Sequence, residues 1–250
     1  MRTILSNLIL KALFSAACVF AQEQIIPQVA DGGGWRSTLV VTNTTAAAVN
    51  GFSLSFLQDV TGGAGATTAW SPTFAEGALP TSIPAGSTVF RHTPGTGSLT
   101  QGWAGVQAPA GVEAYVIYTY TANGRDQDAT APAVSGASRI LVPFDNSNGL
   151  VTALAVVNAN AFPLTIASNF RLSGAAGTVV QGTQLVLPSN GQVAVLLPTQ
   201  FPGTAHVSGL AEFYSNSPAG ATFSIIALRA NPTGGFTSLE TYNESGTPII

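Results

Sequence analysis

The chain has 250 residues, of which 46% are hydrophobic and only 8% are charged, and its formal net charge is −3. Ordinary soluble domains carry about 25% charged residues, so Thr, Ser, Asn, Gln, Gly and Ala must cover most of this surface. The basic residues are too few to form the stripe that nucleic acid or anionic lipid requires. The composition therefore excludes a nucleic-acid partner and suits an exported protein, either at a cell surface, in a matrix or fibre, or free in the medium.

The first 21 residues have the pattern of a signal peptide. A mostly apolar run over residues 4–20 follows a positive charge and ends in small residues, which predicts cleavage between Ala21 and Gln22. The run is too short and too interrupted for a membrane span. A lipoprotein anchored at Cys18 is the alternative. Cys18 is the single cysteine of the chain, so no disulfide can stabilise the exported part.

Short runs rich in Val, Ile, Leu, Phe, Thr and Tyr make up the rest of the chain, with the 27 glycines and 15 prolines between them. No window has a sustained helical period, so the pattern predicts an all-β sandwich or barrel. We expect the first strands at residues 39–42, 52–57, 81–83, 88–90, 103–108 and 112–122. Residues 126–137 are polar and small, and we interpret them as a linker.

The second part of the chain resembles the first in the order of its strands and turns. Residues 35–43 and 150–158 are both apolar, β-branched runs that end at an asparagine, and a proline precedes each of them. The turn at 187–191 takes the place of that at 83–86, and residues 202–207 align with 102–106.

These matches predict two tandem immunoglobulin-like β-sandwich domains after the signal peptide. The domains would cover residues 22–130 and 139–250, with a linker at 131–138.

Three stretches of the chain resemble one known repeat. They cover residues 26–45, 187–197 and 225–229, and they include Leu-Pro-Ser-Asn-Gly-Gln-Val-Ala-Val-Leu-Leu and Ile-Ile-Ala-Leu-Arg. The chain is similar in them to an uncharacterised family of exported two-repeat β-sandwich proteins from environmental, acidobacteria-like bacteria. The resemblance implies an extracellular location and a β-sandwich fold. It implies no activity and no catalytic residue.

Few residues suggest chemistry. His92 and His206 are the two histidines, and neither has the sequence context of a catalytic triad. We therefore expect no enzyme, no catalytic residue and no cofactor. Asp126 and Asp128 alternate in a pattern that could ligate calcium, although the glycine and the closing glutamate of an EF-hand are missing. The other interpretation is a solvated hairpin turn, so we expect no bound metal.

Two groups of residues are candidates for binding. Trp35 and Trp103 could stack on sugar rings, although aromatic residues more commonly fill cores or interfaces. Ile25, Ile26 and Val29 belong to an apolar leader that could add as a strand to the sheet edge of a neighbouring molecule. The alternative is that this leader forms the first strand of its own domain.

We therefore expect a secreted or cell-surface structural or adhesive protein, which could be a subunit of an extracellular assembly. Its partners would be further copies of itself or another cell-surface protein. A carbohydrate-binding module with a glycan ligand is the alternative.

Overall fold

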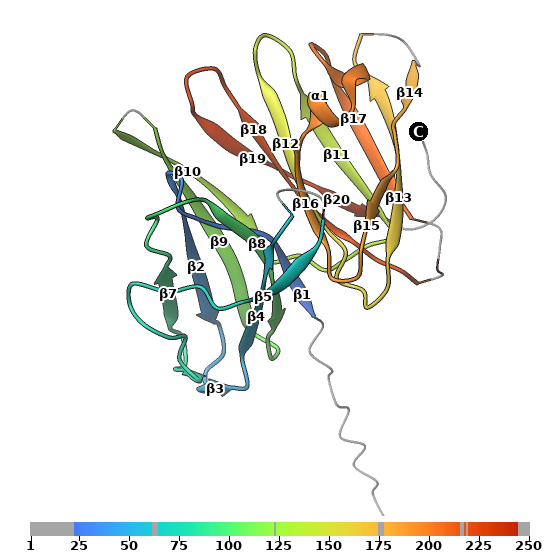
Figure 1. The fold of residues 1–250 in the computed structure, drawn as a ribbon. Coiled ribbons are helices and arrows are strands. Elements are labelled where there is room, and N and C mark those ends of the chain that lie inside the picture. Colours follow the sequence, from blue (N-terminus) through green and yellow to red (C-terminus); the bar gives the residue numbers. More distant parts are fainter. Residues whose placement is uncertain are drawn as a thin grey trace, which may run out of the picture.

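The computed structural model describes residues 23–61, 65–122, 124–174, 178–215, 218 and 220–244. The predicted signal peptide and the alternative lipid anchor at Cys18 lie outside the described residues. Within the described part, antiparallel strands dominate, as the sequence predicts, and they form two groups of sheets (Figure 1). We call these groups the N-terminal half, which holds β1 to β10, and the C-terminal half, which holds β11 to β20.

Two four-stranded sheets form the N-terminal half. The first sheet has the order β1-β8-β4-β5, which are Gln24–Asp31, Thr100–Gln107, Ser53–Asp59 and Thr67–Trp70. The second has the order β10-β9-β2-β7, which are Arg125–Pro132, Val112–Ala122, Trp35–Asn43 and Thr88–His92. A short additional pair joins β3 and β6, which are Val49–Asn50 and Ser82–Ile83.

The C-terminal half also has two main sheets. The first has the order β14-β13-β17-β11-β20, which are Val179–Gln181, Leu164–Leu172, Ser208–Tyr214, Arg139–Asp145 and Tyr242–Glu244. Strand β15 (Leu185–Leu187) also pairs with β13. The second has the order β16-β12-β18-β19, which are Gln192–Leu196, Val151–Val157, Ser224–Ala230 and Phe236–Leu239. A short helix α1 (Leu197–Gln200) and a 3-10 turn η1 (Pro202–Thr204) connect β16 to β17.

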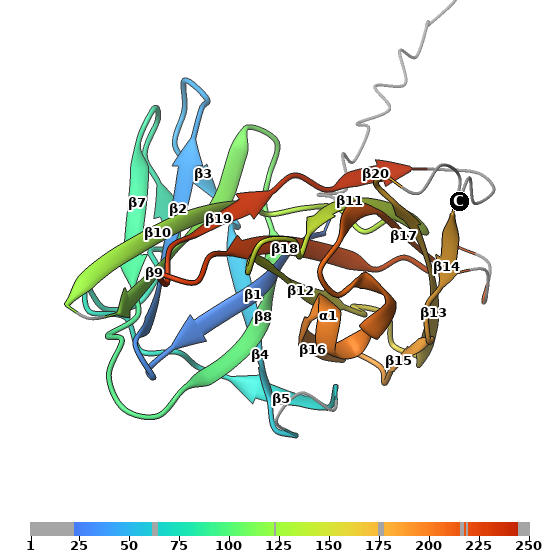
Figure 2. The ribbon, with the colours of Figure 1, turned by 90° about the horizontal axis from the view of Figure 1, so that it is seen from above.

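The two halves have the same order of strands within their sheets. The order β1-β8-β4-β5 corresponds to β11-β17-β13-β14, and the order β10-β9-β2-β7 corresponds to β19-β18-β12-β16. Figure 2 shows the two groups side by side, with β18 and β19 next to the N-terminal half. Strand β20 extends the C-terminal sheet beside β11.

The second strand of the N-terminal half ends at a fully buried asparagine. The Nδ2 amide of Asn43 donates hydrogen bonds to the carbonyl oxygens of Ala47, Ile83 and Pro84, at 2.8, 3.0 and 3.0 Å. Its Oδ1 accepts a bond from the Thr45 backbone N–H. One side chain therefore connects the end of β2 to the loop that precedes β7.

Asn158 makes the same set of contacts at the end of β12. Its Nδ2 donates to the carbonyl oxygens of Phe162, Leu187 and Pro188, at 2.8, 3.4 and 2.8 Å. Its Oδ1 accepts a bond from the backbone N–H two residues later, as in Asn43. The asparagines at which the two similar sequence runs end thus have the same structural role.

A glycine marks the corresponding place on β8 and on β17. A Cβ added to Gly102 would lie 1.9 Å from the Leu57 carbonyl oxygen, and one added to Gly209 would lie 2.2 Å from the Arg171 carbonyl oxygen. The neighbouring strand passes too close at both places for any side chain. The prediction that residues 202–207 correspond to 102–106 is therefore wrong, because the strand that corresponds to β8 begins at Ser208.

The strand order differs from that of an immunoglobulin constant domain. In that domain the first strand lies beside the second in one sheet. Here β1 lies beside β8, while β9 lies beside β2 in the other sheet. The sheets are antiparallel as predicted, but the first strand of each half lies in the sheet opposite to that of β2 or β12.

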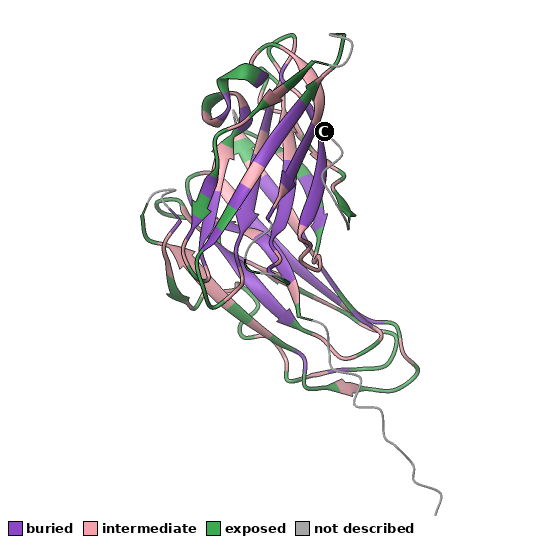
Figure 3. Ribbon diagram, turned by 90° about the vertical axis from the view of Figure 1, so that its right-hand side faces the viewer, coloured by how far each residue is buried: buried purple, intermediate pink, exposed green. Residues whose placement is uncertain are grey.

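Alternation of side chains explains why these strands form. Strand β9 buries every second residue over its first part, and its buried residues include Val112, Ala114, Val116 and Tyr118. Successive side chains of a strand point to opposite faces, so this pattern places one face in a core. Each half has such a core between its two sheets. Figure 3 shows the buried positions along the middle of the strands and the exposed ones mainly in the loops.

The segment predicted as a linker is partly a strand. Residues 126–132 belong to β10, which pairs with β9. Val134 then forms an isolated bridge to Ile25, and Ala137 forms one to Phe223. The backbone between the two halves is therefore hydrogen-bonded to both of them. Its polar composition misled the prediction, because the inward residues of β10 are the small Ala129 and Ala131.

The predicted detached leader is also a strand of its own half. Residues 24–31 form β1, which pairs with β8, and Ile25, Ile26 and Val29 are buried. Addition of this strand to a neighbouring molecule would have to break that pairing. The structure thus agrees with the alternative interpretation, in which the leader is the first strand of its own sheet.

Candidate functional site

The two halves meet through the outer faces of two sheets. The sheet that contains β1 and β8 lies against the sheet that contains β12 and β18. Ile25 and Trp103 form one buried apolar cluster with Val157, and Ala155 and Ile226 join the core of the N-terminal half. We call this contact region the junction.

A single glutamine side chain provides several of the polar contacts of the junction. Gln192 is 1% exposed, and its Nε2 amide lies 2.7 Å from the Pro27 carbonyl oxygen, 3.0 Å from that of Gly102 and 2.6 Å from Oε1 of Gln28. Its backbone N–H donates to the Gly65 carbonyl oxygen at 3.0 Å. A side chain of the C-terminal half thus satisfies main-chain acceptors of the N-terminal half.

The turn before Gln192 adds two more bonds across the junction. Asn190 has a positive φ of 56°, a conformation that asparagine tolerates better than most residues. Its carbonyl oxygen accepts from the Trp103 indole N–H at 3.0 Å and from the Thr67 hydroxyl at 2.7 Å. The indole of Trp103 is therefore a structural group of the junction.

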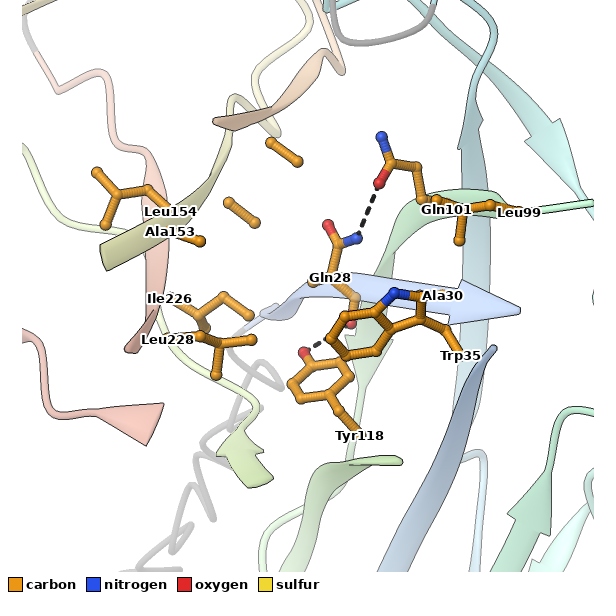
Figure 4. Close-up of a pocket in the computed structure, with 12 residues that line it drawn as sticks. Gln28, Ala30, Trp35, Leu99, Gln101, Tyr118, Ala153, Leu154, Ile226 and Leu228 are labelled. Carbon is orange, nitrogen blue, oxygen red and sulfur yellow. Dashed lines mark hydrogen bonds between the residues drawn. The ribbon is translucent and has the colours of Figure 1, made fainter. Parts of the chain in front are cut away.

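A cavity of about 180 Å³ lies at the junction beside Trp35 (Figure 4). Ile226 and Leu228 border it from the C-terminal half, while Trp35 and Tyr118 border it from the other side. Its lining is mostly apolar and consists of Gln28, Ala30, Trp35, Leu99, Gln101, Tyr118, Ala153, Leu154, Ala155, Ala194, Ile226 and Leu228. Three of these lining residues of the C-terminal half are alanines, at positions 153, 155 and 194.

Other aromatic rings hold Trp35 in place. Its ring stacks on Tyr120 with centroids 4.7 Å apart and makes a tilted contact with Phe236 at 5.2 Å. Trp35 begins β2 and Phe236 begins β19, so this contact also joins the two halves. The indole therefore forms a fixed wall of the cavity.

The polar side-chain groups of the cavity are two carboxamides, one phenol and the indole N–H of Trp35. The Tyr118 hydroxyl donates to the Gln28 carbonyl oxygen at 2.8 Å, and burial raises the pKa of this phenol well above its usual value of 10.0. Tyr118 is thus a neutral donor at physiological pH. The Gln28 amide lies 3.4 Å from Oε1 of Gln101, and the Gln101 amide lies 3.5 Å from Oδ2 of Asp59. Both distances exceed the usual range of about 2.7–3.2 Å, so both bonds are weak.

A second cleft, of about 250 Å³, lies at the junction on the side of Phe236. Its lining is more polar and consists of Gln127, Leu150, Arg229, Asn231, Gly235, Phe236 and Thr237. Arg229 lies 3.5 Å from Asp145. Hydrogen bonds from Ser147 and the charge of Arg229 hold the pKa of the Asp145 carboxyl below its usual 3.8.

The two tryptophans proposed for sugar binding lie in different environments. Trp35 lines the cavity, as described above. Trp103 is 3% exposed and packs against Val157, so neither face of its ring is open to a ligand. Of the two, only Trp35 remains a candidate for ligand contact.

The predicted calcium candidates lie on a strand and not in a loop. Asp126 and Asp128 belong to β10, and their Oδ1 atoms accept hydrogen bonds from the hydroxyls of Thr121 and Thr119, at 2.5 and 2.6 Å. Within the described ranges, no three His, Cys, Asp or Glu residues lie close enough to hold a metal ion.

The two histidines lie far apart in the fold. His92 ends β7 and pairs with the exposed Glu76, and a hydrogen bond from the His92 backbone N–H is the main cause of the lowered pKa of that carboxyl. His206 lies between η1 and β17 with a positive φ of 62°. Glu212 is buried beside Arg139, with 3.7 Å between Oε1 and Nε.

Comparisons with known proteins find no family model, no curated protein and no solved structure that matches this chain. Among the described helices, none combines the length and the apolar character that a bilayer span needs.

Sequence reasoning singled out Trp35, Trp103 and Ile25, which all lie at the junction, but it missed the glutamines and Tyr118. Gln28, Gln101 and Gln192 occur in ordinary strand contexts, and no local motif distinguishes them from solvated glutamines. Tyr118 belongs to a strand that the sequence predicts, but its contact with Gln28 joins two different sheets. The contacts of these residues depend on how the sheets pack, and a single sequence does not reveal that packing.

Proposed function

We propose that this protein is an exported structural or adhesive module, in which two copies of one β-sandwich form a single rigid unit. The contact around Gln192 carries this proposal. Two sandwiches on a flexible linker would move independently, whereas here one buried amide, an indole and a hydroxyl all hydrogen-bond across the junction. A rigid pair of sandwiches transmits force and presents its surfaces at a fixed angle.

The correspondence between the halves supports the duplication. The two halves have the same strand order, and Asn43 and Asn158 make matching contacts. The domain type in this proposal is a variant of the immunoglobulin-like sandwich, in which the first strand lies in the sheet opposite to the second strand. The proposed boundaries follow the strands, with one domain at 24–132 and the other at 139–244.

The low charge content of the chain favours binding to another protein as the role of the module. The chain has few charged residues, and we propose that it is exported and works without a catalytic centre. Its partner would be a second copy of itself or another cell-surface protein.

Unfolding experiments test the rigid unit. Wild-type protein should unfold in one urea transition when several probes are compared. Gln192→Ala leaves the Pro27 and Gly102 carbonyl oxygens without this donor, and we expect it to cost about 2–4 kcal/mol or to separate the unfolding of the halves. Gln181→Ala, on the exposed part of β14, is the matched control. Equal behaviour of the two variants would refute the rigid unit.

Cell experiments test the adhesive role. Antibodies against the purified protein should label intact cells of the strain that makes it, and deletion of its gene should reduce attachment of the cells to a surface or to each other. Complementation with the wild-type chain should restore attachment. Undiminished attachment of the deletion strain would contradict the proposal.

Carbohydrate binding is the second candidate, and the cleft beside Phe236 favours it. Its polar lining and its aromatic ring offer both the hydrogen bonds and the stacking surface that a sugar needs. A glycan array with wild-type protein, Phe236→Ala and Asn231→Ala tests it. We expect both variants to lose any glycan signal that wild type gives, while Trp103→Phe should retain it.

A further inference from the structure

We propose that the cavity beside Trp35 is a binding site for a small, uncharged ring compound that carries one hydrogen-bonding group. The cavity lies between the two halves, so this proposal rests on the rigid unit of the proposed function but not on its adhesive role.

The size of the cavity limits the ligand to one ring. Drug-sized ligands occupy pockets of roughly 300–1,000 Å³, and the volume here is about 180 Å³. An apolar cavity of about 150 Å³ is large enough to bind benzene. The space therefore fits one six-membered ring with a short substituent.

The lining excludes a charged ligand. None of the twelve residues that border the cavity is an Asp, Glu, Lys, Arg or His. A charged group would lose its hydration there without gaining a partner of opposite charge, which is costly. The ligand must therefore be neutral.

The two weak amide contacts provide the place for one polar group. The Gln28–Gln101 and Gln101–Asp59 bonds are long, at 3.4 and 3.5 Å. The amide of Gln101 can turn towards a ligand at little cost, because it gives up only weak bonds. A hydroxyl or carboxamide on the ring could form a hydrogen bond with the Gln101 amide in place of these weak bonds. A sugar ring has about as many hydroxyls as carbons, and the few polar groups of this lining would leave several of them unpaired.

The aromatic wall is already in position for a ring. Tyr120 and Phe236 fix Trp35 in its conformation, so the indole loses little entropy when a ligand binds. Ile226 and Leu228 face it across the cavity (Figure 4). A flat or slightly puckered ring would contact the indole on one side and these aliphatic side chains on the other.

Calorimetry and thermal melts with defined probes test the site. The probes are phenol, benzyl alcohol and benzamide, with toluene as the ring without a polar group, benzoate as the charged ring and glucose as the sugar. We expect the three neutral polar rings to bind and to raise Tm, toluene to bind more weakly, and benzoate and glucose not to bind.

Two variants locate the binding. Ala194→Leu fills the cavity and should lower the affinity for benzyl alcohol at least tenfold. Ala46→Leu, in an exposed loop outside the cavity, should leave this affinity unchanged. Gln101→Leu should lower the affinity for benzyl alcohol but not the affinity for toluene. A crystal soaked in 4-iodophenol should place the iodine between Trp35 and Leu228, which tests the site even if a variant fails to fold.

Three results would overturn the proposal. The first is that none of the neutral rings binds to wild-type protein. The second is that Ala194→Leu binds them as tightly as Ala46→Leu does, or that the iodine lies elsewhere. The third is that glucose or benzoate binds in the cavity beside Trp35 more tightly than the neutral rings do. Adhesion assays are unaffected by any of these results, so the two proposals can fail separately.

Discussion

Replacement of the two buried asparagines is the sharpest test of the correspondence between the halves. Asn43 and Asn158 are both 0% exposed, and each donates to three carbonyl oxygens. Asn43→Ala and Asn158→Ala remove these donors and also the Oδ1 acceptor that orders the following turn. We expect both variants to be destabilised by similar amounts.

The magnitude follows from how deeply each contact is buried. One of the three bonds of each asparagine is fully buried, and the other two are partly buried. A buried acceptor without its donor costs about 1–3 kcal/mol, and an ordinary partly buried hydrogen bond is worth about 0.5–1.5 kcal/mol. Because the remaining groups can relax, the expected loss is about 2–4 kcal/mol for each variant.

Urea unfolding at constant temperature measures these losses. Asn43→Asp is an informative companion, because it keeps the shape but places an acceptor where three carbonyl oxygens need a donor. It should be destabilised at least as much as Asn43→Ala. Asn50→Ala, at an exposed position of β3, is the control and should change the unfolding free energy by less than about 0.5 kcal/mol. The reasoning fails if Asn43→Ala or Asn158→Ala costs no more than this control.

Three further predictions follow from the same structure. Gly102→Ala places a Cβ 1.9 Å from the Leu57 carbonyl oxygen, so it should lower the unfolding free energy by about 3 kcal/mol; a change below about 1 kcal/mol in urea unfolding would contradict the close approach. The lowered pKa of Asp145 means that its ionised form stabilises the fold above its usual pKa of 3.8 and that this stability is lost as the pH falls through the folded-state pKa. Asp145→Asn should therefore lose less stability than wild type between about pH 5 and about pH 2, and parallel pH profiles of the two proteins would disprove this. Trp103→Phe removes the indole donor to the Asn190 carbonyl oxygen and should cost about 1–2 kcal/mol in thermal or urea unfolding; wild-type stability in this variant would show that the bond is dispensable.

The strands could be predicted where their own residues alternate. Residues 112–122 form β9 as expected, because the β-branched and aromatic side chains of this run alternate between the core and the outside. Strand β10 could not be predicted in this way, since it pairs through its backbone and buries only alanines.

The arrangement of the strands in the sheets is harder to predict from the sequence than their positions along the chain. The two similar runs at 35–43 and 150–158 do occupy the same place in the strand order. However, the alignment of residues 202–207 with β8 was wrong. Gly209 of β17 is the residue that corresponds to Gly102, and the alignment by local similarity did not include it. The pairing of β1 with β8, where an immunoglobulin domain pairs the first strand with the second, depends on residues far apart in the chain, which no local pattern encodes.

The candidate site was the least predictable part. Trp35 was identified as an aromatic residue of interest, but the cavity needs residues from both halves. Trp103, Asp126 and Asp128 were selected for their chemistry alone. Burial of the indole and the position of both aspartates on a strand give them structural surroundings that composition does not indicate.

The acceptors that Gln192 contacts on the opposite half include two main-chain oxygens, those of Pro27 and Gly102. Main-chain oxygens are present whichever side chain a residue carries. Over evolutionary time the residue at position 27 could therefore vary without removing its acceptor, while the glutamine itself could not. Among relatives of this protein, position 192 should accordingly vary far less than position 27.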